Sequence, residues 1–316
     1  MSNMSMNIVV LDGYAANPGD ISWEGFEKLG RLTVYERTSP EDIVSRCLDA
    51  DAVLTNKCHI TKQIIEQLPK LKYIGELATG YNNIDVEAAA ERGVAVSNVP
   101  AYSTDCVAQL VFAFILEAAV HVGEHSRAVL GGQWQNCKDF CFWNYPLTEI
   151  GSKRLGIIGN GRIGKRVGEI ASAFGMKVSA YSPSKNSPDE LSEIISQSDI
   201  ISLNCPLKPN NIRMINVETI ARMKQGVWLI NTARGALIDE DAVSEALASG
   251  KIGYYCADVM STEPIRPDNP LLKAPNVILT PHIGWAPYEA RVRLMNIAID
   301  NLKAFLRSER LNRVDG

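Results

Sequence analysis

Short apolar runs alternate with amphipathic stretches along the first hundred residues. The run Asn7-Ile8-Val9-Val10-Leu11 has the length and composition of a buried strand. Similar runs follow it, and segments with helical periodicity lie between them. The expected strands are residues 32–35, 52–54, 73–77 and 94–97, and the expected helices are residues 40–48, 61–68 and 86–92. Alternating β and α elements of this length predict a parallel sheet covered by helices.

One long amphipathic stretch, residues 103–130, precedes a second alternating region. Ser103 and Thr104 are suitable N-terminal caps for a single helix, and Gly131-Gly132 would end it. Beyond an aromatic segment, the expected strands are residues 154–159, 177–182, 200–204, 227–231, 254–258 and 277–280. The expected helices are residues 163–174, 190–197, 217–223, 241–249 and 288–306. Six strands with intervening helices are what a complete doubly wound nucleotide domain requires.

The length and composition of the chain exclude several classes of protein. A chain of 316 residues is long enough for two domains, and its formal net charge of −4 argues against a nucleic-acid-binding protein. No apolar run approaches the length of a membrane span, and the first residues lack the features of a signal peptide. The seven cysteines include no Cys-x-x-Cys pair, so we expect reduced thiols in a cytoplasmic protein and no metal site.

The glycine-rich segment Gly159-Asn160-Gly161-Arg162-Ile163-Gly164 follows an apolar strand and opens a helix. Gly159 permits a tight turn, Gly161 permits close approach of a pyrophosphate, and Gly164 permits close helix–strand packing. Because the strand and helix lie where this motif requires them, the segment predicts dinucleotide binding.

The residue expected to contact the adenosine ribose is Ser182, where dinucleotide-binding domains commonly carry an acid. A carboxylate there would repel a 2′-phosphate, whereas a serine near Lys185 and Arg162 can accept one. NADP(H) is therefore expected to be tolerated or preferred. The alternative, that Ser182 simply binds the ribose of NAD less tightly, stays open.

Three polar residues follow strands of the second region at or just beyond their carboxyl ends, where open α/β sheets bind ligands. They are Arg234, Glu263 and His282. Taken singly, each also has a structural interpretation: Arg234 as a surface ion-pair partner, Glu263 as a solvated loop acid, and His282 as a hydrogen-bonded structural histidine.

Four motifs in order along the chain together resemble the D-isomer-specific 2-hydroxyacid dehydrogenases as a whole. They are the glycine-rich segment, Asn231-Thr232-Ala233-Arg234-Gly235, Asp258-Val259-Met260-Ser261-Thr262-Glu263-Pro264 and Thr280-Pro281-His282-Ile283-Gly284. Further segments, among them Val53-Leu54-Thr55-Asn56-Lys57, Leu77-Ala78-Thr79-Gly80-Tyr81-Asn82 and Phe140-Cys141-Phe142-Trp143, resemble the glycerate dehydrogenase (hydroxypyruvate reductase) branch of that family. The resemblance implies two doubly wound parallel-sheet domains, a flavodoxin-like substrate domain and a Rossmann nucleotide domain, with a cleft between them. Because about 150 residues precede the glycine-rich segment, the nucleotide domain is expected at residues 101–285, inserted into a substrate domain of residues 1–100 and 286–316.

The resemblance also implies roles for individual residues in the reduction of a small 2-oxo acid, such as hydroxypyruvate or glyoxylate, to the D-2-hydroxy acid. His282 is the acid that protonates the carbonyl oxygen, Glu263 pairs with it and stabilises the imidazolium, and Arg234 holds the substrate. From the other domain, Thr79 and Gly80 would offer backbone N–H groups to the substrate carboxylate. Asn56 and Lys57 would line the same space, or else simply end a strand at the solvent.

For the cofactor, NAD or NADP, the resemblance implies a set of contacts along the second domain. Gly159, Gly161, Arg162, Ile163 and Gly164 would hold the pyrophosphate, Ser182 the ribose, Cys205 and Pro206 the adenine, Thr232, Ala233 and Asp258 the nicotinamide end, and Thr104 a phosphate.

Relatives in this family form two-fold dimers through a helix and arm that correspond here to residues 102–150, which predicts a homodimer. Phe142 or Trp143 would then reach the partner's active site, or else pack within one subunit. A nucleotide-sensing corepressor-like scaffold of the same fold is the alternative function, and a panel of 2-oxo acids would separate the two.

Overall fold

The computed structural model describes residues 6–182 and 185–316, and the chain divides into two compact units. Unit 1 comprises the described residues of Met1–Tyr102 together with Trp285–Gly316, and unit 2 comprises Ser103–Gly284. The chain therefore passes from unit 1 into unit 2 and back again. The sequence analysis placed these two crossings after residues 100 and 285.

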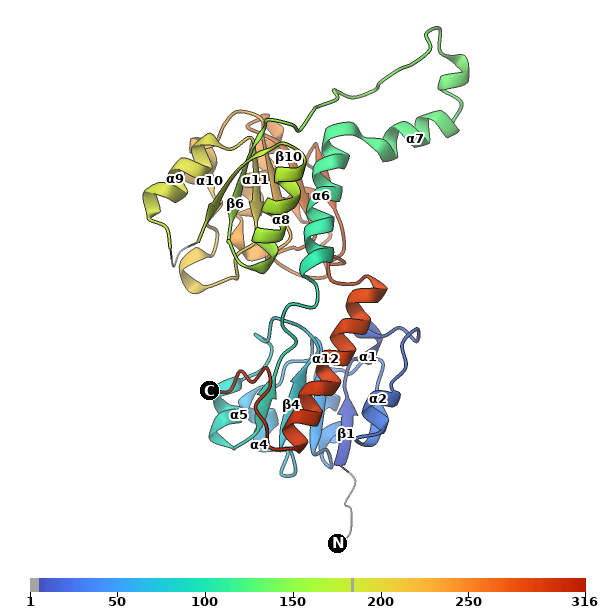
Figure 1. The fold of residues 1–316 in the computed structure, drawn as a ribbon, viewed down its shortest axis with the longest axis vertical. Helices are drawn as coiled ribbons and strands as arrows, with labels where there is room; N and C mark the ends of the chain where they lie inside the picture. Colours follow the sequence, from blue (N-terminus) through green and yellow to red (C-terminus); the bar gives the residue numbers. More distant parts are fainter. Residues whose placement is uncertain (1–5, 183–184) are drawn as a thin grey trace. The chain divides into compact units, whose positions relative to one another are not determined.

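Unit 1 is built on a parallel sheet with the strand order β2-β1-β3-β4-β5 (Figure 1). Its strands are β1 (Met6–Val10), β2 (Gly30–Val34), β3 (Ala52–Thr55), β4 (Tyr73–Glu76) and β5 (Ala95–Ser97). Its helices are α1 (Gly13–Ala16), α2 (Glu24–Glu27), α3 (Ile43–Cys47), α4 (Lys62–Glu66), α5 (Val86–Glu91) and α12 (Tyr288–Leu306). This order is that of flavodoxin-like folds, in which all strands run parallel and the direction of strand addition across the sheet reverses between β1 and β3.

Side chains of the unit 1 strands alternate between two apolar layers, as the pleat requires. One face, with Val9, Val53 and Ile74, packs on α3, α4 and α5. On the opposite face lie α2 and α12, and the rings of Tyr73 and Phe305 are 5.0 Å apart there. Helices on both faces explain why the strands read as continuous apolar runs.

Unit 2 holds a six-stranded parallel sheet, counted over the residues that the structure describes. Its strands are β6 (Arg154–Ile158), β7 (Lys177–Tyr181), β8 (Ile200–Leu203), β9 (Val227–Asn231), β10 (Ile252–Ala257) and β11 (Val277–Leu279). Its helices are α6 (Thr104–Val120), α7 (Val122–Leu130), α8 (Arg162–Ala173), α9 (Pro188–Gln197), α10 (Val217–Arg222) and α11 (Glu240–Ala248). Two parallel-sheet α/β units, the fold class expected from the sequence, are therefore confirmed.

The strand order of unit 2 is β11-β10-β9-β8-β6-β7, which differs from the 3-2-1-4-5-6 order common in dinucleotide-binding domains. After β7 the chain enters α9 and then adds β8 directly beside β6. In the described part of the chain, no strand lies outside β7, so β7 is the edge of the sheet. The connection between β7 and α9 includes residues 183–184, which lie outside the described residues.

The two faces of the unit 2 sheet carry separate apolar cores. Ile200, Trp228 and Ile230 face α6 and α8, whereas their neighbours Ile201 and Leu229 face α9, α10 and α11. Figure 1 shows the helices in these two layers. This alternation buries both faces and leaves the carboxyl edge of the sheet for polar residues.

The single helix expected at residues 103–130 is wrong, because the structure breaks it at His121 and bends the two parts by 56°. His121 has φ 49°, in the left-handed region, and is buried. Its Nε2 lies 3.1 Å from the hydroxyl oxygen of Tyr254, and its ring stacks on that of Tyr145. These contacts from distant parts of the chain hold a bend that no glycine or proline marks.

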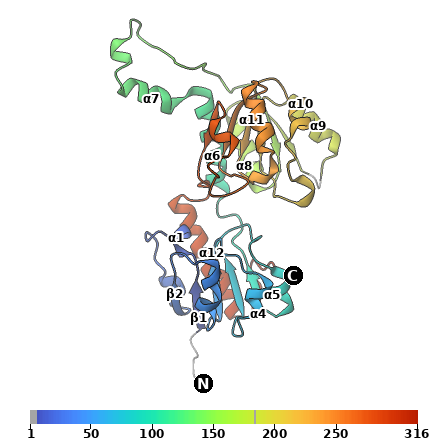
Figure 2. The ribbon, with the colours of Figure 1, turned by 180° about the vertical axis from the view of Figure 1, so that it is seen from behind.

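Figures 1 and 2 show α7 and the following segment projecting from the rest of unit 2. Large apolar side chains on this projection are exposed, among them Leu130, Phe140 and Trp143. Among the described helices none is by itself long and apolar enough to cross a membrane, although the bent pair α6 and α7 passes that test together.

Candidate active site

His282 and Glu263 form a hydrogen-bonded pair beyond the carboxyl ends of β11 and β10. The Nδ1 of His282 lies 2.7 Å from the Oε2 of Glu263, and both side chains are partly exposed. The other carboxylate oxygen of Glu263 accepts a hydrogen bond from the backbone N–H of Met260. Because a carboxylate accepts only, Nδ1 carries a proton and donates it to this bond. Nε2 is then the nitrogen that can exchange a proton with a ligand.

Asp258, the residue after β10, fixes the segment that carries His282. Its Oδ1 accepts hydrogen bonds from the Thr280 hydroxyl at 2.6 Å and the Ile283 N–H at 2.8 Å, and its Oδ2 accepts one from the Gly284 N–H at 2.8 Å. His282 itself adopts φ 55°, a conformation that side chains rarely take without support. The buried carboxylate of Asp258 supplies that support.

Arg234 follows β9 and is exposed, and in the described part of the chain its guanidinium has no ion-pair partner. Its Nη1 donates only to the carbonyl oxygen of Ala233. The next residue, Gly235, packs so tightly that a Cβ there would lie 1.8 Å from the carbonyl carbon of Met260. This contact brings the Arg234 segment against the segment that holds Glu263. The structure thus gathers all three candidate side chains at one edge of the unit 2 sheet.

The glycine-rich turn has the geometry that a phosphate-binding turn requires. Gly159 has φ +108°, and a Cβ there would lie 2.5 Å from the backbone nitrogen of Cys205. A Cβ on Gly164 would lie 2.0 Å from the carbonyl oxygen of Gly159, whereas one on Gly161 would meet no atom within 4 Å. Open space at Gly161 and the uncapped N-terminus of α8, beside exposed Arg162 and half-buried Ile163, suit a phosphate group.

Ser182 lies directly after β7, beside the glycine-rich turn. The N–H of Gly159 donates to the carbonyl oxygen of Tyr181, the residue before Ser182. Asn186 accepts a hydrogen bond from the N–H of Ser182, and its own N–H donates to the Ser182 carbonyl. These bonds close a turn that leaves the side chains of Arg162 and Lys185 exposed.

The remaining candidate cofactor residues follow the strand ends of unit 2, apart from Thr104, which begins α6. Cys205 is buried and Pro206 exposed after β8, while Thr232 and Ala233 are partly buried after β9. Within the described residues, the buried Oγ1 of Thr232 and the buried Oδ1 of Asn204 have no hydrogen-bond partner. Polar atoms of this kind at a sheet edge fit a polar ligand such as a dinucleotide.

In unit 1, Thr79 and Gly80 form the tip of the loop after β4. The hydroxyl of Thr79 donates to the carbonyl oxygen of Val99, and the side chain of Asn98 donates to the carbonyl oxygen of Thr79. The backbone N–H groups of Thr79 and Gly80 donate to no other described residue. Two free N–H groups on an anchored loop are suited to bind a carboxylate.

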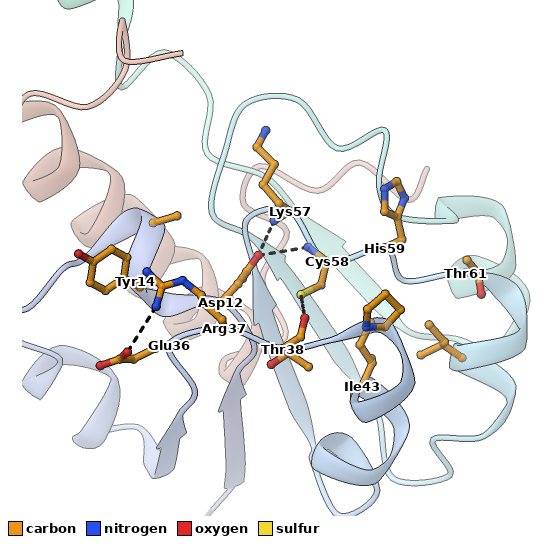
Figure 3. A pocket seen from close by; sticks show the side chains of 13 residues that line it. Asp12, Tyr14, Glu36, Arg37, Thr38, Ile43, Lys57, Cys58, His59 and Thr61 are labelled. Carbon is orange, nitrogen blue, oxygen red and sulfur yellow. Dashed lines mark hydrogen bonds and ion pairs between the residues drawn. The ribbon is translucent and has the colours of Figure 1, made fainter. Parts of the chain in front are cut away.

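Asn56 and Lys57 follow β3 and differ in exposure. Asn56 is buried and donates from Nδ2 to the carbonyl oxygen of Leu77 at 2.7 Å, whereas Lys57 is exposed. The carboxylate of Asp12 accepts the N–H group of Asn56 and those of Lys57 and Cys58. Figure 3 shows the last two of these bonds. Burial excludes the alternative that Asn56 faces the solvent. Lys57 lines a hollow of about 420 Å³ beside Asp12, at the point where the strand order reverses.

Sequence reasoning missed the acids that hold these loops. Asp12 follows β1 and organises the turn after β3, and Glu240 accepts three hydrogen bonds from Ser261 and Asn269. The signal for Asp12 was present, since a polar residue just beyond the end of an apolar strand identified Arg234 and His282 in the same way. Glu240 carried no such signal, because its partners lie more than twenty residues away.

Comparison with known proteins places the chain in a family. Residues 112–284 match the model of the D-isomer specific 2-hydroxyacid dehydrogenase NAD binding domain. A relative named hydroxypyruvate reductase, from Blautia hydrogenotrophica, is 50% identical over 98% of this chain and 100% of its own. The chain belongs to the D-isomer-specific 2-hydroxyacid dehydrogenase family.

Solved structures agree with this assignment. An acyclic imino acid reductase (Bsp5) in complex with NADPH and D-Arg has a TM-score of 0.86 and 30% identity, covering 98% of this chain and 100% of that one. D-lactate dehydrogenase from Aquifex aeolicus, complexed with NAD and lactic acid, has a TM-score of 0.83 and 28% identity, covering 98% and 99%. The chain is an NAD(P)-dependent oxidoreductase that acts on the CH–OH group of its donor, and the scaffold alternative is not favoured.

Proposed function

We propose that this enzyme reduces small 2-oxo acids of the hydroxypyruvate and glyoxylate type to the corresponding 2-hydroxy acids, with the D configuration where C2 is a stereocentre. The observation that carries the proposal is the His282–Glu263 pair at the sheet edge that also presents Arg234. The relative named hydroxypyruvate reductase supports the choice of substrate class. A carboxylate partner suits a reaction that moves a proton as well as a hydride, because it stabilises the imidazolium.

In this proposal His282 is the general acid. Its Nδ1–H is committed to Glu263, so the proton reaches the substrate carbonyl oxygen from Nε2. Glu263 keeps the ring oriented and stabilises its cationic form. In the reverse direction, the same nitrogen takes the proton from the hydroxyl group of the D-2-hydroxy acid.

Arg234 binds the carbonyl and carboxylate oxygens of the substrate. Its guanidinium is free of acidic partners in the described residues, and its planar fork of donors matches two oxygens at once. The N–H groups of Thr79 and Gly80, in the loop after β4 of unit 1, bind the substrate carboxylate. Asn56 and Lys57, which follow the neighbouring strand β3, line the same space.

The residues of unit 2 fit an NAD(P) cofactor. Gly159, Gly161, Arg162, Ile163 and Gly164 hold the pyrophosphate, Ser182 the ribose, and Thr104 a phosphate. Cys205 and Pro206 cover the adenine, and Thr232, Ala233 and Asp258 orient the nicotinamide end. When bound, the nicotinamide supplies the hydride, while the protein supplies position and the proton.

For the choice between the two nicotinamide cofactors, we propose that NADPH is used at least as well as NADH. Ser182 adds no negative charge beside the ribose, and Arg162 and Lys185 are exposed cations with no ion-pair partner among the described residues. A neutral hydroxyl flanked by free cations accommodates a 2′-phosphate that a carboxylate would repel. The structure solved with NADPH shows that a relative of this fold binds it.

We further propose a homodimer formed through α6, α7 and the arm that follows. Exposed Leu130, Phe140 and Trp143 are too apolar for a surface in water, and a hollow of about 460 Å³ lies between α7 and the arm. Light scattering would report twice the mass of 34.7 kDa.

A cytoplasmic location stays a prediction from the cysteines.

A panel of 2-oxo acids tests the proposed function. Purified protein is given hydroxypyruvate, glyoxylate or pyruvate with NADH or NADPH, and oxidation of the reduced nicotinamide is followed by absorbance. We expect the highest kcat/KM with hydroxypyruvate or glyoxylate, and NADPH at least equal to NADH. No turnover with any acid would overturn the function, and a large NADH preference would overturn only the cofactor proposal.

A further inference from the structure

Glu76 is a buried acid at the last position of β4, directly before the loop that carries Thr79 and Gly80. Only 1% of its surface is exposed. Its Oε2 accepts a hydrogen bond from the Nδ2 of Asn83 at 3.0 Å, and the same Nδ2 donates to the carbonyl oxygen of Cys58 at 3.1 Å. The Asn83 amide therefore joins the end of β4 to the turn after β3.

These hydrogen bonds close a loop. Glu76 lies at its beginning, Asn83 at its end, and Thr79 and Gly80 at its tip. A second anchor, Asn98, donates to the carbonyl oxygen of Thr79 at 2.7 Å. With both ends and the tip held, the N–H groups of Thr79 and Gly80 keep one direction. Glu76 is thus placed to act on a ligand through the loop without touching it.

The surroundings of Glu76 favour its neutral form. The pKa of its carboxyl is raised to about 9, chiefly by burial and also by the nearby carboxylate of Asp12, whereas the Asn83 hydrogen bond and the Lys57 ammonium act in the opposite direction. Cys58, the other titratable neighbour, is itself held neutral, since burial raises its pKa to about 11. Near neutral pH the Glu76 side chain is therefore an uncharged hydrogen-bonding group.

We propose that Glu76 is a positioning residue that holds the Thr79–Gly80 loop ready for the substrate carboxylate by way of its hydrogen bond with Asn83. This inference rests on the proposed function, in which those two N–H groups bind that carboxylate. An ionised Glu76 would place a buried negative charge beside the partly exposed carboxylate of Asp12 and behind the loop that receives an anion. The residue acts on substrate binding and leaves the chemical step to Arg234, Glu263 and His282.

Substitutions of Glu76 distinguish a positioning role from an effect on folding stability alone. Glu76→Ala removes the acceptor for Asn83 and is expected to raise KM for the 2-oxo acid roughly tenfold with little change in kcat. Glu76→Gln has the same shape, still accepts from Asn83 and carries no charge, so it restores KM to near the wild-type value. Glu87→Gln, an exposed acid in the first turn of α5, is the matched control and leaves both constants unchanged.

The pH dependence supplies a second readout. In the wild-type protein KM is expected to rise as the pH passes about 9, where Glu76 ionises, whereas Glu76→Gln loses that rise and Glu87→Gln keeps it. Stability changes over a different range. Glu76 keeps its proton in the folded protein, whereas the unfolded chain releases it near the ordinary pKa of 4.5. As the pH rises from 4.5 to about 9, the free energy of unfolding of the wild type therefore falls relative to that of Glu76→Gln.

The decisive experiment measures KM and kcat against pH for wild type, Glu76→Gln, Glu76→Ala and Glu87→Gln, together with hydrogen exchange of the amides of residues 77–83. Faster exchange in Glu76→Ala than in Glu76→Gln, with the KM pattern above, supports the proposal. An unchanged KM in Glu76→Ala, or the same alkaline rise in Glu76→Gln as in wild type, overturns it. If wild type reduces no acid, the proposed function fails, and equal loop exchange in the two variants then overturns the positioning role separately.

Discussion

The carboxyl edges of the two parallel sheets place ligand-binding groups in the same topological position but present different chemistry. In unit 2 the edge presents side chains, Arg234 and His282, the latter held at φ 55° by the buried carboxylate of Asp258. In unit 1 the edge presents backbone N–H groups, those of Thr79 and Gly80, on a loop held by buried or partly buried acids and amides.

This difference separates the residues that take part in the chemical step from the groups that recognise the substrate. In the proposed function, the side chains that transfer the proton and bind the reacting oxygens are His282 and Arg234, and both lie in unit 2. Backbone N–H groups add no titratable group, so unit 1 contributes recognition that depends on loop position. Substitutions in unit 2 should therefore lower kcat/KM most, and substitutions in unit 1 should act mainly on KM.

A loss of activity second only to that of His282→Ala is expected from Arg234→Ala. Removing the guanidinium leaves the substrate oxygens without their paired donors, so kcat/KM should fall by at least about a hundredfold. Arg234→Lys keeps the charge and loses the planar fork, and should recover only part of the activity. Steady-state kinetics with hydroxypyruvate measure both, and circular dichroism should show unchanged folding because Arg234 is exposed. Activity of Arg234→Ala near that of wild type would contradict the division between the units.

Gly164→Ala tests the cofactor turn and should have a smaller effect. The added Cβ would lie 2.0 Å from the carbonyl oxygen of Gly159, so the turn must shift, and binding of NADPH should weaken roughly tenfold. Gly168→Ala on the same helix is the control, because its Cβ would make ordinary contacts of 3.4 and 3.5 Å. Fluorescence titration with NADPH gives both dissociation constants, and equal values for the two variants would refute the packing argument.

The smallest effect is expected from Asp12→Asn in unit 1. The carboxylate accepts three backbone N–H groups around Lys57, two of which Figure 3 shows, and an amide retains only one accepting oxygen. The turn after β3 loosens, and KM should rise by about threefold while kcat is kept. Glu36→Gln, an exposed acid lining the same hollow, should change neither constant. A fall in kcat with constant KM would place chemistry in unit 1.

Much of the fold was predictable because apolar periodicity records which face of a strand or helix is buried. Helix α12 begins and ends where the pattern placed it, at Tyr288–Leu306. Some strands were predicted to end too late, at points where the chain leaves the sheet abruptly. The strand expected at residues 154–159 ends at Ile158, because Gly159 has φ +108°. The break at His121 was missed because Tyr254, its partner, lies 133 residues away. The strand order of unit 2 depends on pairing between strands, which local patterns do not encode.

The candidate site was predictable only in part for a related reason. Polar residues just beyond the ends of apolar strands identified Arg234 and His282, and a rule about sheet edges linked them. Glu76 escaped notice because an acid at the end of an apolar run looks like the edge of a strand. Its significance depends on Asn83 and on burial that only the folded chain creates.

The most direct test of the account compares two histidines, one on each sheet edge. His282 is paired with Glu263 in unit 2, whereas His59 is an exposed residue lining the hollow in unit 1. The measurement is kcat/KM for hydroxypyruvate reduction by His282→Ala and His59→Ala. We expect a loss of roughly a thousandfold for the first and almost none for the second. Near wild-type turnover by His282→Ala would show that the proton comes from another group and would contradict the account.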